Sequence, residues 1–162
     1  MTDAIRLLIV DDEEDFLETV KMRLESRGFA VATATNGEEA VDLAGREPFD
    51  LALVDMQMPG IDGQELLARL KAQHSYIEVI MLTGHGSIQS AVECGKLGAF
   101  DYLTKPYELD ELILKLKDAY EHRLRRKFER DEERLEQLMK SAIGESPLSI
   151  LRRFRKMDSA DE

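Results

Sequence analysis

Five polar side chains stand where apolar runs of the chain end. The set comprises Asp11, Asp12, Asp55, Thr83 and Lys105, each of which directly follows such a run or lies within two residues of its end. Three carboxylates brought to one place repel each other, and a bound cation makes that arrangement tolerable. Oxygen ligands without His or Cys favour a hard ion, and Mg²⁺ accepts one or two carboxylates together with a phosphate oxygen. These residue types therefore predict a magnesium site.

A magnesium site with these neighbours suits phosphoryl chemistry. A lysine ammonium would neutralise further negative charge, and a threonine hydroxyl would donate a hydrogen bond to a phosphoryl oxygen. One aspartate in the middle of the sheet would then attack phosphorus and form an acyl phosphate. Positioning and charge neutralisation would supply most of the catalysis.

Short apolar runs alternate with helical patterns over the first 108 residues. Strands are predicted over residues 5–10, 30–35, 51–54, 79–82 and 100–103. Between them, apolar residues three and four apart indicate helices, with Asn36 and Asp62 as starts and Gly28 as a stop. This alternation predicts a parallel sheet covered by helices on both faces, in which ligands bind at the carboxyl ends of the strands. The polar set is therefore expected to converge on one edge.

Four segments of the chain resemble the receiver domains of bacterial two-component response regulators. They are LLIVDDEED, LALVDMQMPGIDG, VIMLTGHG and AFDYLTKP, and they occur in the family's order on the expected elements. The resemblance covers roughly residues 4–120, and its details are most similar to the nitrogen-regulation branch. It implies a flavodoxin-like α/β fold with five parallel strands in the order 2-1-3-4-5.

The resemblance implies a role for each strand-end residue. Asp55 matches the phosphoacceptor, and Asp11 and Asp12 match the acidic pair of the Mg²⁺ site, with Asp12 as a direct ligand. The backbone carbonyl of Gln57 matches a further metal ligand. Lys105 matches the lysine of the family, and its bond to Pro106 matches the usual cis peptide.

Four positions are implied to switch or tune the site. Thr83 matches the hydroxyl residue that follows the phosphoryl group on activation, and Tyr102 matches the aromatic residue that turns inward. Gln57 and His85 match the positions that tune dephosphorylation.

Each residue also has a plainer structural interpretation. Asp11 alone would be a helix N-cap, Asp55 a turn residue and Thr83 a loop cap. Tyr102 would be an ordinary core or surface aromatic residue. Phosphatases of the haloacid-dehalogenase type need a second carboxylate two residues after the nucleophile, and Gln57 stands there instead. Cys94 is predicted to be a small packing residue.

The composition and charge of the chain limit the classes of protein to which it can belong. The chain has 162 residues with a formal net charge of −11, one Cys and no run of 18 apolar residues. No disulfide framework, cysteine zinc site, membrane span or secretion signal is predicted, so a cytoplasmic protein is expected. Residues 1–108 carry the whole net charge of −11, whereas residues 109–162 hold 13 basic and 13 acidic side chains. The body is too acidic to attract nucleic acid through a general positive field.

The charge-balanced segment predicts an appendage, so we divide the chain into a receiver over residues 1–120 and a helical extension over 121–162. A helix from about residue 108 to Gly144 contains an imperfect coiled-coil seam from Phe128 onward. Its distal half needs a partner, which favours self-association. A short basic amphipathic helix follows Ser146, and it could fold back on the long helix, pack on a dimer mate, dock on a protein, or contact nucleic acid or a membrane surface.

Together these features predict a phosphoacceptor regulator rather than an enzyme. A histidine kinase or a histidine phosphotransfer protein would supply the phosphoryl group, and the output would be a protein–protein interface that includes a homodimer. Two alternatives remain: a nucleic-acid-binding output in the tail, and a phosphorelay intermediate. The 40 residues after the receiver are too few for a winged-helix or AAA+ output domain.

Overall fold

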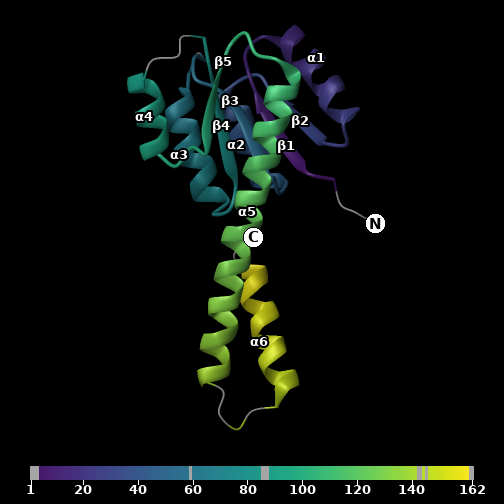
Figure 1. Cartoon of the computed structure of the whole chain (residues 1–162), viewed down its shortest axis with the longest axis vertical. Coiled ribbons are helices and arrows are strands. Elements are labelled where there is room, and N and C mark those ends of the chain that lie inside the picture. Colours follow the sequence, from purple (N-terminus) through teal and green to yellow (C-terminus); the bar gives the residue numbers. More distant parts are fainter. Residues whose placement is uncertain (1–3, 59, 85–87, 142–143, 145, 161–162) are drawn as a thin grey trace.

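The computed structural model describes residues 4–58, 60–84, 88–141, 144 and 146–160. Strands and helices alternate along the body, and two helices complete the tail (Figure 1). The elements are β1 Arg6–Val10, α1 Glu14–Glu25, β2 Ala30–Ala34, α2 Gly37–Arg46, β3 Leu51–Asp55, α3 Gly63–Gln73, β4 Glu78–Thr83, α4 Ile88–Lys96, β5 Asp101–Thr104, α5 Leu109–Ser141 and α6 Pro147–Ala160. The five predicted strands are confirmed to within two residues at each end.

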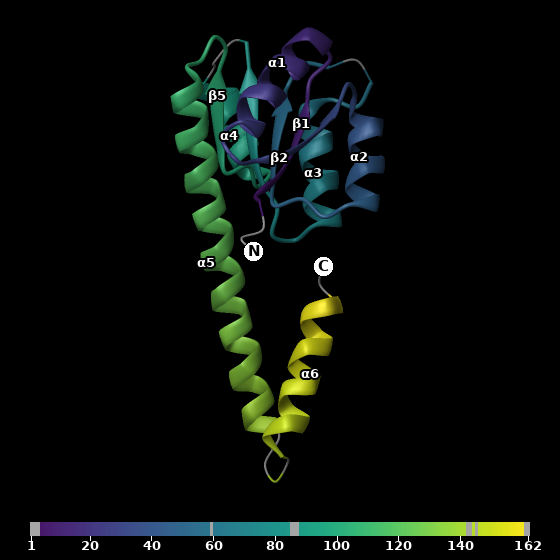
Figure 2. The same cartoon turned by 90° about the vertical axis from the view of Figure 1, so that its right-hand side faces the viewer.

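The sheet has five parallel strands in the order β2-β1-β3-β4-β5, which confirms the predicted flavodoxin-like fold. Neighbouring residues of β1 point to opposite faces, so Leu7 and Leu8 enter two separate cores. Helices α1 and α5 cover one face, and α2, α3 and α4 cover the other (Figures 1 and 2). Because both faces are buried, the middles of β3 and β4 are continuously apolar, and their polar residues stand at the strand ends.

Local sequence signals place the helices as expected. Asn36 Oδ1 accepts a hydrogen bond from the Glu39 backbone N–H at 2.8 Å, and Asp62 Oδ1 accepts one from the Glu65 N–H at 2.8 Å. Gly63 begins α3 in close contact with β3, since a Cβ there would lie 2.7 Å from the Met56 Cα. That close approach holds the start of α3 beside the end of β3.

Helix α5 runs unbroken from the receiver body into the tail. Its 33 residues correspond to about 50 Å, so its second half projects beyond the sheet. Helix α6 turns back and packs against the far end of α5, where Leu138 is 8% exposed, and it diverges from α5 toward its own C-terminal end (Figure 2). Of the alternatives for the basic helix, packing against its own α5 is therefore the one observed.

A network of charges fastens α5 to the base of the sheet. Glu78 begins β4 and is only 2% exposed, yet its carboxylate binds the Arg126 guanidinium and lies 3.3 Å from His122 Nδ1. The Lys71 ammonium is 3.9 Å away. These contacts join the base of β4 to the middle of α5.

Candidate functional site

The fold brings the five predicted strand-end residues to one edge of the sheet. Asp55 and Thr83 are the last residues of β3 and β4, and Asp11 and Lys105 directly follow β1 and β5. Asp11 is fully buried, and Asp55 and Thr83 are each 7% exposed. Lys105 is tied to the neighbouring strand because its backbone N–H donates to the Thr83 carbonyl at 2.8 Å. The Lys105–Pro106 peptide bond is cis, as expected.

The acidic residues form a compact cluster. One carboxylate oxygen from each of Asp11, Asp12 and Asp55 lies within 4.8 Å of the other two, and Asp12 is exposed. Oxygen-only donors of this charge fit a magnesium ion, which would reduce their mutual repulsion and keep several waters on the open side. The exposed Gln57 lies two residues beyond Asp55. A role for its carbonyl as a ligand stays a prediction.

Lys105 bridges two of the carboxylates. Its ammonium lies 2.8 Å from Asp11 Oδ2 and 3.6 Å from Asp55 Oδ2. Burial by itself would lower the pKa of Lys105, but the hydrogen bond to Asp11 and the nearby carboxylates outweigh it and raise that pKa. Lys105 therefore stays a cation at neutral pH.

Asp55 is held by two different donors. Its Oδ1 accepts a hydrogen bond from the Gln57 backbone N–H at 3.1 Å, and its Oδ2 faces Lys105. Burial raises the pKa of Asp55, as do the charges of Asp11 and Asp12, while the Gln57 N–H and Lys105 oppose that rise. A bound Mg²⁺ ion would add positive charge at this site and would therefore favour the ionised, nucleophilic form of the Asp55 carboxylate.

The Asp11 carboxylate forms a hydrogen bond at each of its two oxygens. Its Oδ1 accepts a hydrogen bond from the Glu13 backbone N–H at 2.9 Å, just before α1, while its Oδ2 binds Lys105. The N-cap of α1 is Glu13, so Asp11 is not the helix cap; its carboxylate instead orders the turn before α1 and takes part in the site.

Tyr102 is the predicted switch residue that does not lie in the core of the site. Tyr102 lies on β5 with 40% of its surface exposed, so its ring points outward. Its inward movement stays a prediction. His85 lies outside the described residues. Cys94 is 1% exposed in the core, which confirms its packing role.

Two aromatic residues of the site were not singled out from the sequence. The Lys105 ammonium lies 4.6 Å from the centre of the Phe16 ring, a cation–π contact, and Phe16 meets Tyr107 edge to face at 6.3 Å. The Tyr107 hydroxyl is buried without a hydrogen-bond partner among the described residues. Burial and the charge of Asp11 raise the pKa of this hydroxyl. The position of Tyr107 directly after Lys105–Pro106 was the available signal.

The fold and the acidic edge define a doubly wound α/β domain with an aspartate cluster at the carboxyl ends of its strands. The family described as response regulator receiver domain matches residues 7–117. The chain therefore belongs to the receiver family of response regulators, which act in two-component signalling.

Curated relatives share this domain and extend beyond it. The chain is 39% identical over 113 residues to the transcriptional regulatory protein YkoG of Bacillus subtilis, covering 70% of this chain and 50% of YkoG. It is 36% identical over 119 residues to a putative NtrX-like response regulator of Rickettsia bellii, covering 72% of this chain and 25% of that protein. The chain thus spans half or less of the length of these relatives.

Solved structures confirm the fold. A CheY-like receiver domain from Methanospirillum hungatei superposes with a TM-score of 0.73 at 31% identity, covering 76% of this chain and 99% of that one. NtrX from Brucella abortus superposes with a TM-score of 0.76 at 30% identity, covering 86% of this chain and 34% of its own. Because the match to NtrX covers 86% of this chain, which is more than the receiver body alone, the structural similarity extends into the tail. No helix among the described residues is long and apolar enough to cross a membrane.

Proposed function

We propose that Asp55 accepts a phosphoryl group from a phosphohistidine of a sensor kinase or a phosphotransfer protein. The observation that carries this proposal is the cluster of Asp11, Asp12 and Asp55 carboxylates beside the Lys105 ammonium. A carboxylate oxygen of Asp55 attacks phosphorus as the bond from phosphorus to the imidazole nitrogen breaks. The imidazole keeps the electron pair and takes up a proton, and Asp55 becomes an acyl phosphate.

The side chains around Asp55 have complementary tasks in this transfer. A Mg²⁺ ion held by Asp11, Asp12 and Asp55, with the Gln57 carbonyl, would supply charge neutralisation for the phosphoryl oxygens. Lys105 is close enough to both Asp11 and Asp55 to pair with a phosphoryl oxygen. The Thr83 hydroxyl would donate a hydrogen bond to another phosphoryl oxygen. That hydrogen bond would pull on the end of β4 and draw Tyr102 of the neighbouring β5 inward. Gln57 and His85 would set the lifetime of the phosphoryl group on Asp55.

Incubation with acetyl phosphate and Mg²⁺ tests the site. We expect one added phosphoryl group by intact-mass spectrometry, sensitive to hydroxylamine as an acyl phosphate is. Asp55→Asn should abolish the addition because the amide oxygen is a poor nucleophile. Asp42→Asn is the matched control, since Asp42 is exposed on α2 and pairs with its helix neighbour Arg46. Phosphorylation that persists in Asp55→Asn would contradict the assignment.

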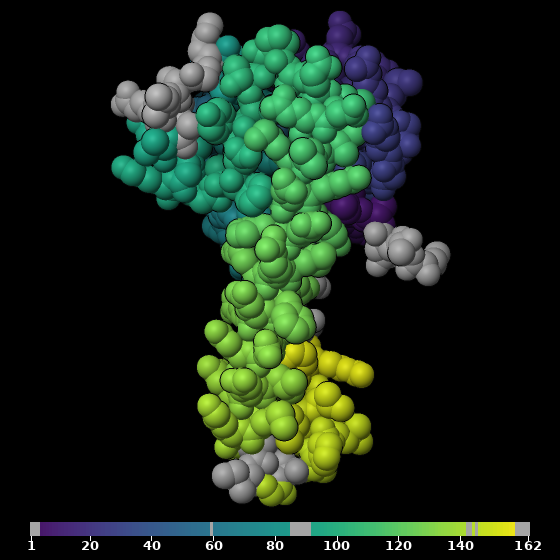
Figure 3. Space-filling view, viewed as in Figure 1, coloured from purple at the N-terminus to yellow at the C-terminus, as the bar shows by residue number. Residues whose placement is uncertain are grey.

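We further propose that the tail, over residues 121–162, carries self-association into a homodimer. Exposed apolar side chains on α5 include Leu124, Phe128 and Met139, and Phe128 is 67% exposed. Spacings of 4 and 11 residues keep the three on one side of the helix, and the tail projects clear of the body (Figure 3). Helix α6 adds the exposed Leu148 and Leu151. A second copy would cover surface that α6 leaves open.

Sedimentation with and without beryllofluoride, a phosphoryl mimic, tests this output. We expect the sedimentation mass to change with the mimic and Mg²⁺, and Phe128→Ser to reduce the dimer. Truncation after Tyr120 should give a monomer. Arg125→Gln, an exposed neighbour on α5, is the control. If neither the truncation nor Phe128→Ser changes the number of chains per particle, the tail is excluded as the interface.

A nucleic-acid-binding output is a second candidate. Relatives of this chain are named transcriptional regulators, and α6 carries Arg152, Arg153, Arg155 and Lys156. In gel retardation, a DNA complex that weakens as salt rises would support this output. No complex at low salt would remove it and favour the protein interface.

A further inference from the structure

An aromatic ring covers the cation of the acidic edge. The Lys105 ammonium lies over the Phe16 ring, 4.6 Å from its centre. The same ammonium lies 2.8 Å from Asp11 Oδ2 and 3.6 Å from Asp55 Oδ2. Phe16 stands in the first turn of α1, is half-buried, and packs against the core that α1 and α5 cover. The cation is therefore held by two carboxylates and by one π face.

A second ring fixes the orientation of the first. Tyr107 meets Phe16 edge to face, with the ring centres 6.3 Å apart and the planes at 85°. This arrangement is favoured because the positive edge of one ring meets the negative face of the other. Tyr107 stands two residues after Lys105, so the segment that carries the cation also carries the ring that holds Phe16 in place.

The carboxylates and the ring differ in what else they bind. Asp11 and Asp55 belong to the cluster that fits Mg²⁺, so the metal and the Lys105 ammonium would share the same two carboxylates and repel each other. The carboxylates would then hold Lys105 less firmly than they do in the metal-free protein. The Phe16 ring offers no ligand atom to a hard metal ion, so its attraction for the ammonium is retained.

The lysine side chain benefits from such a hold because it is long and flexible. Ordering it costs conformational entropy, and that cost falls on the transfer step when the side chain is free before the phosphoryl group arrives. A cation–π contact fixes the place of the ammonium but does not use up its N–H donors on an acceptor oxygen. The Lys105 ammonium can thus exchange a carboxylate oxygen for a phosphoryl oxygen while it stays over the Phe16 ring.

We propose that Phe16 is a positioning residue for phosphoryl transfer, whose ring keeps the Lys105 ammonium beside Asp55 as that ammonium changes its acceptor from carboxylate to phosphoryl oxygen. The proposal rests on the assignment of Asp55 as the phosphoacceptor. Phe16 acts through Lys105 and needs no contact of its own with the phosphoryl group or the metal.

The rate of phosphorylation by acetyl phosphate at saturating Mg²⁺ tests the proposal. We expect Phe16→Leu to lower the rate constant about fivefold, as the loss of a half-buried cation–π contact does, whereas Phe16→Tyr keeps a π face and stays within about twofold. A ring-fluorinated phenylalanine incorporated at position 16 keeps the shape of the ring but weakens its negative face, so it should also lower the rate. In a Lys105→Ala background, Phe16→Leu should cause no further decrease.

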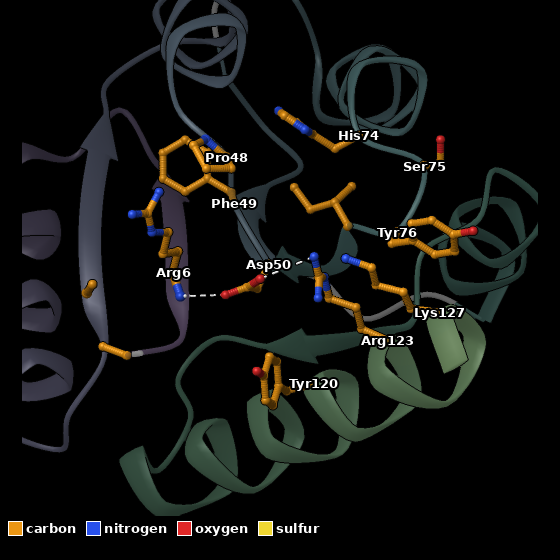
Figure 4. Close-up of a pocket in the computed structure, with 13 residues that line it drawn as sticks. Arg6, Pro48, Phe49, Asp50, His74, Ser75, Tyr76, Tyr120, Arg123 and Lys127 are labelled. Atoms are coloured by element: carbon orange, nitrogen blue, oxygen red, sulfur yellow. Dashed lines mark hydrogen bonds and ion pairs between the residues drawn. The ribbon is translucent and has the colours of Figure 1, made fainter. Parts of the chain in front are cut away.

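A measurement without metal or phosphodonor tests the contact itself. In NMR spectra of the metal-free protein with ¹³C-labelled lysine, the ring current of Phe16 should shift the Lys105 Cε protons upfield, and Lys105→Arg identifies their signal. The shift should persist in Phe16→Tyr and disappear in Phe16→Leu. Phe49→Leu is the matched control, because Phe49 is 5% exposed and lines the pocket at the opposite end of the sheet (Figure 4); it should alter neither the shift nor the rate.

Several results would overturn the proposal. One is an unchanged rate in Phe16→Leu, and another is a decrease in Phe16→Leu that the fluorinated protein does not share, since Phe16 would then only pack. An equal decrease in Phe49→Leu, a decrease that persists undiminished in the Lys105→Ala background, or an unshifted Lys105 signal would overturn it as well. Failure of the phosphoacceptor assignment is distinguishable from all of these, because Asp55→Asn would then still be phosphorylated.

Discussion

Replacing Arg126 tests how firmly the tail helix is fastened to the receiver. The Glu78 carboxylate is 2% exposed and has Arg126, His122 and Lys71 around it. Removing one partner of a buried ion pair costs about 3–5 kcal/mol. Arg126 is 37% exposed and two other nitrogen groups remain near Glu78, so we expect Arg126→Gln to cost about 2 kcal/mol of unfolding free energy.

Thermal unfolding followed by circular dichroism measures that loss. A cost of about 2 kcal/mol lowers Tm by about 4–8 °C in a chain of this length. The double variant Glu78→Gln/Arg126→Gln should lose less than the sum of the two single variants, by at least about 1 kcal/mol, because no charge is then left buried alone. Arg125→Gln is the matched control on the neighbouring, exposed position.

Two results would refute the reasoning. The first is a Tm decrease in Arg126→Gln no larger than that in Arg125→Gln. The second is strict additivity in the double variant, which would mean that Glu78 and Arg126 do not interact. The contact between Glu78 and Arg126 also affects how truncations are interpreted. A chain cut after Tyr120 loses Arg123 and Arg126, whereas a chain cut after Arg130 keeps the contacts between α5 and the sheet and therefore tests the tail alone.

The remaining predictions concern single side chains. Burial raises the pKa of the Cys94 thiol, so we expect Ellman's reagent to react with it only when the protein unfolds; rapid reaction of the folded protein would contradict the packing. Asn36→Ala removes the cap on the Glu39 N–H and should cost about 1 kcal/mol in chemical denaturation, and an unchanged midpoint would show that the cap contributes nothing. Asp12→Ala should weaken Mg²⁺ binding in calorimetry because it removes a hard oxygen ligand, with Asp15→Ala on the exposed face of α1 as control; equal affinity in both would remove Asp12 from the site.

The elements of the body could be predicted because their signals are local. An apolar run such as LALV has one stable place, the middle of a sheet buried on both faces, and Asn36 and Asp62 mark helix starts by their own hydrogen bonds. The strand-end chemistry followed from topology, since parallel strands deliver their carboxyl ends to a single edge.

Features that depend on distant partners escaped prediction. Glu78 precedes an apolar run and resembles a solvated strand start, but it is buried because α5 brings Arg126 to it from 48 residues later. Phe16 stands in an apolar helix pattern that indicates packing alone, whereas its contact with Lys105 arises only when the chain folds. The tail pattern was ambiguous because one apolar stripe can be covered by α6 or by a second copy.

The unbroken course of α5 gives the molecule a lever arm. No Gly or Pro interrupts the helix between Pro106 and Gly144, so bending within it is resisted along its whole length. A tilt of about 5° at the base of the sheet would carry the far end of the projecting half of α5, roughly 25 Å long, through about 2 Å. A displacement of that size separates or joins packed side chains, so a small adjustment at the sheet becomes an all-or-none change of contact at the tip.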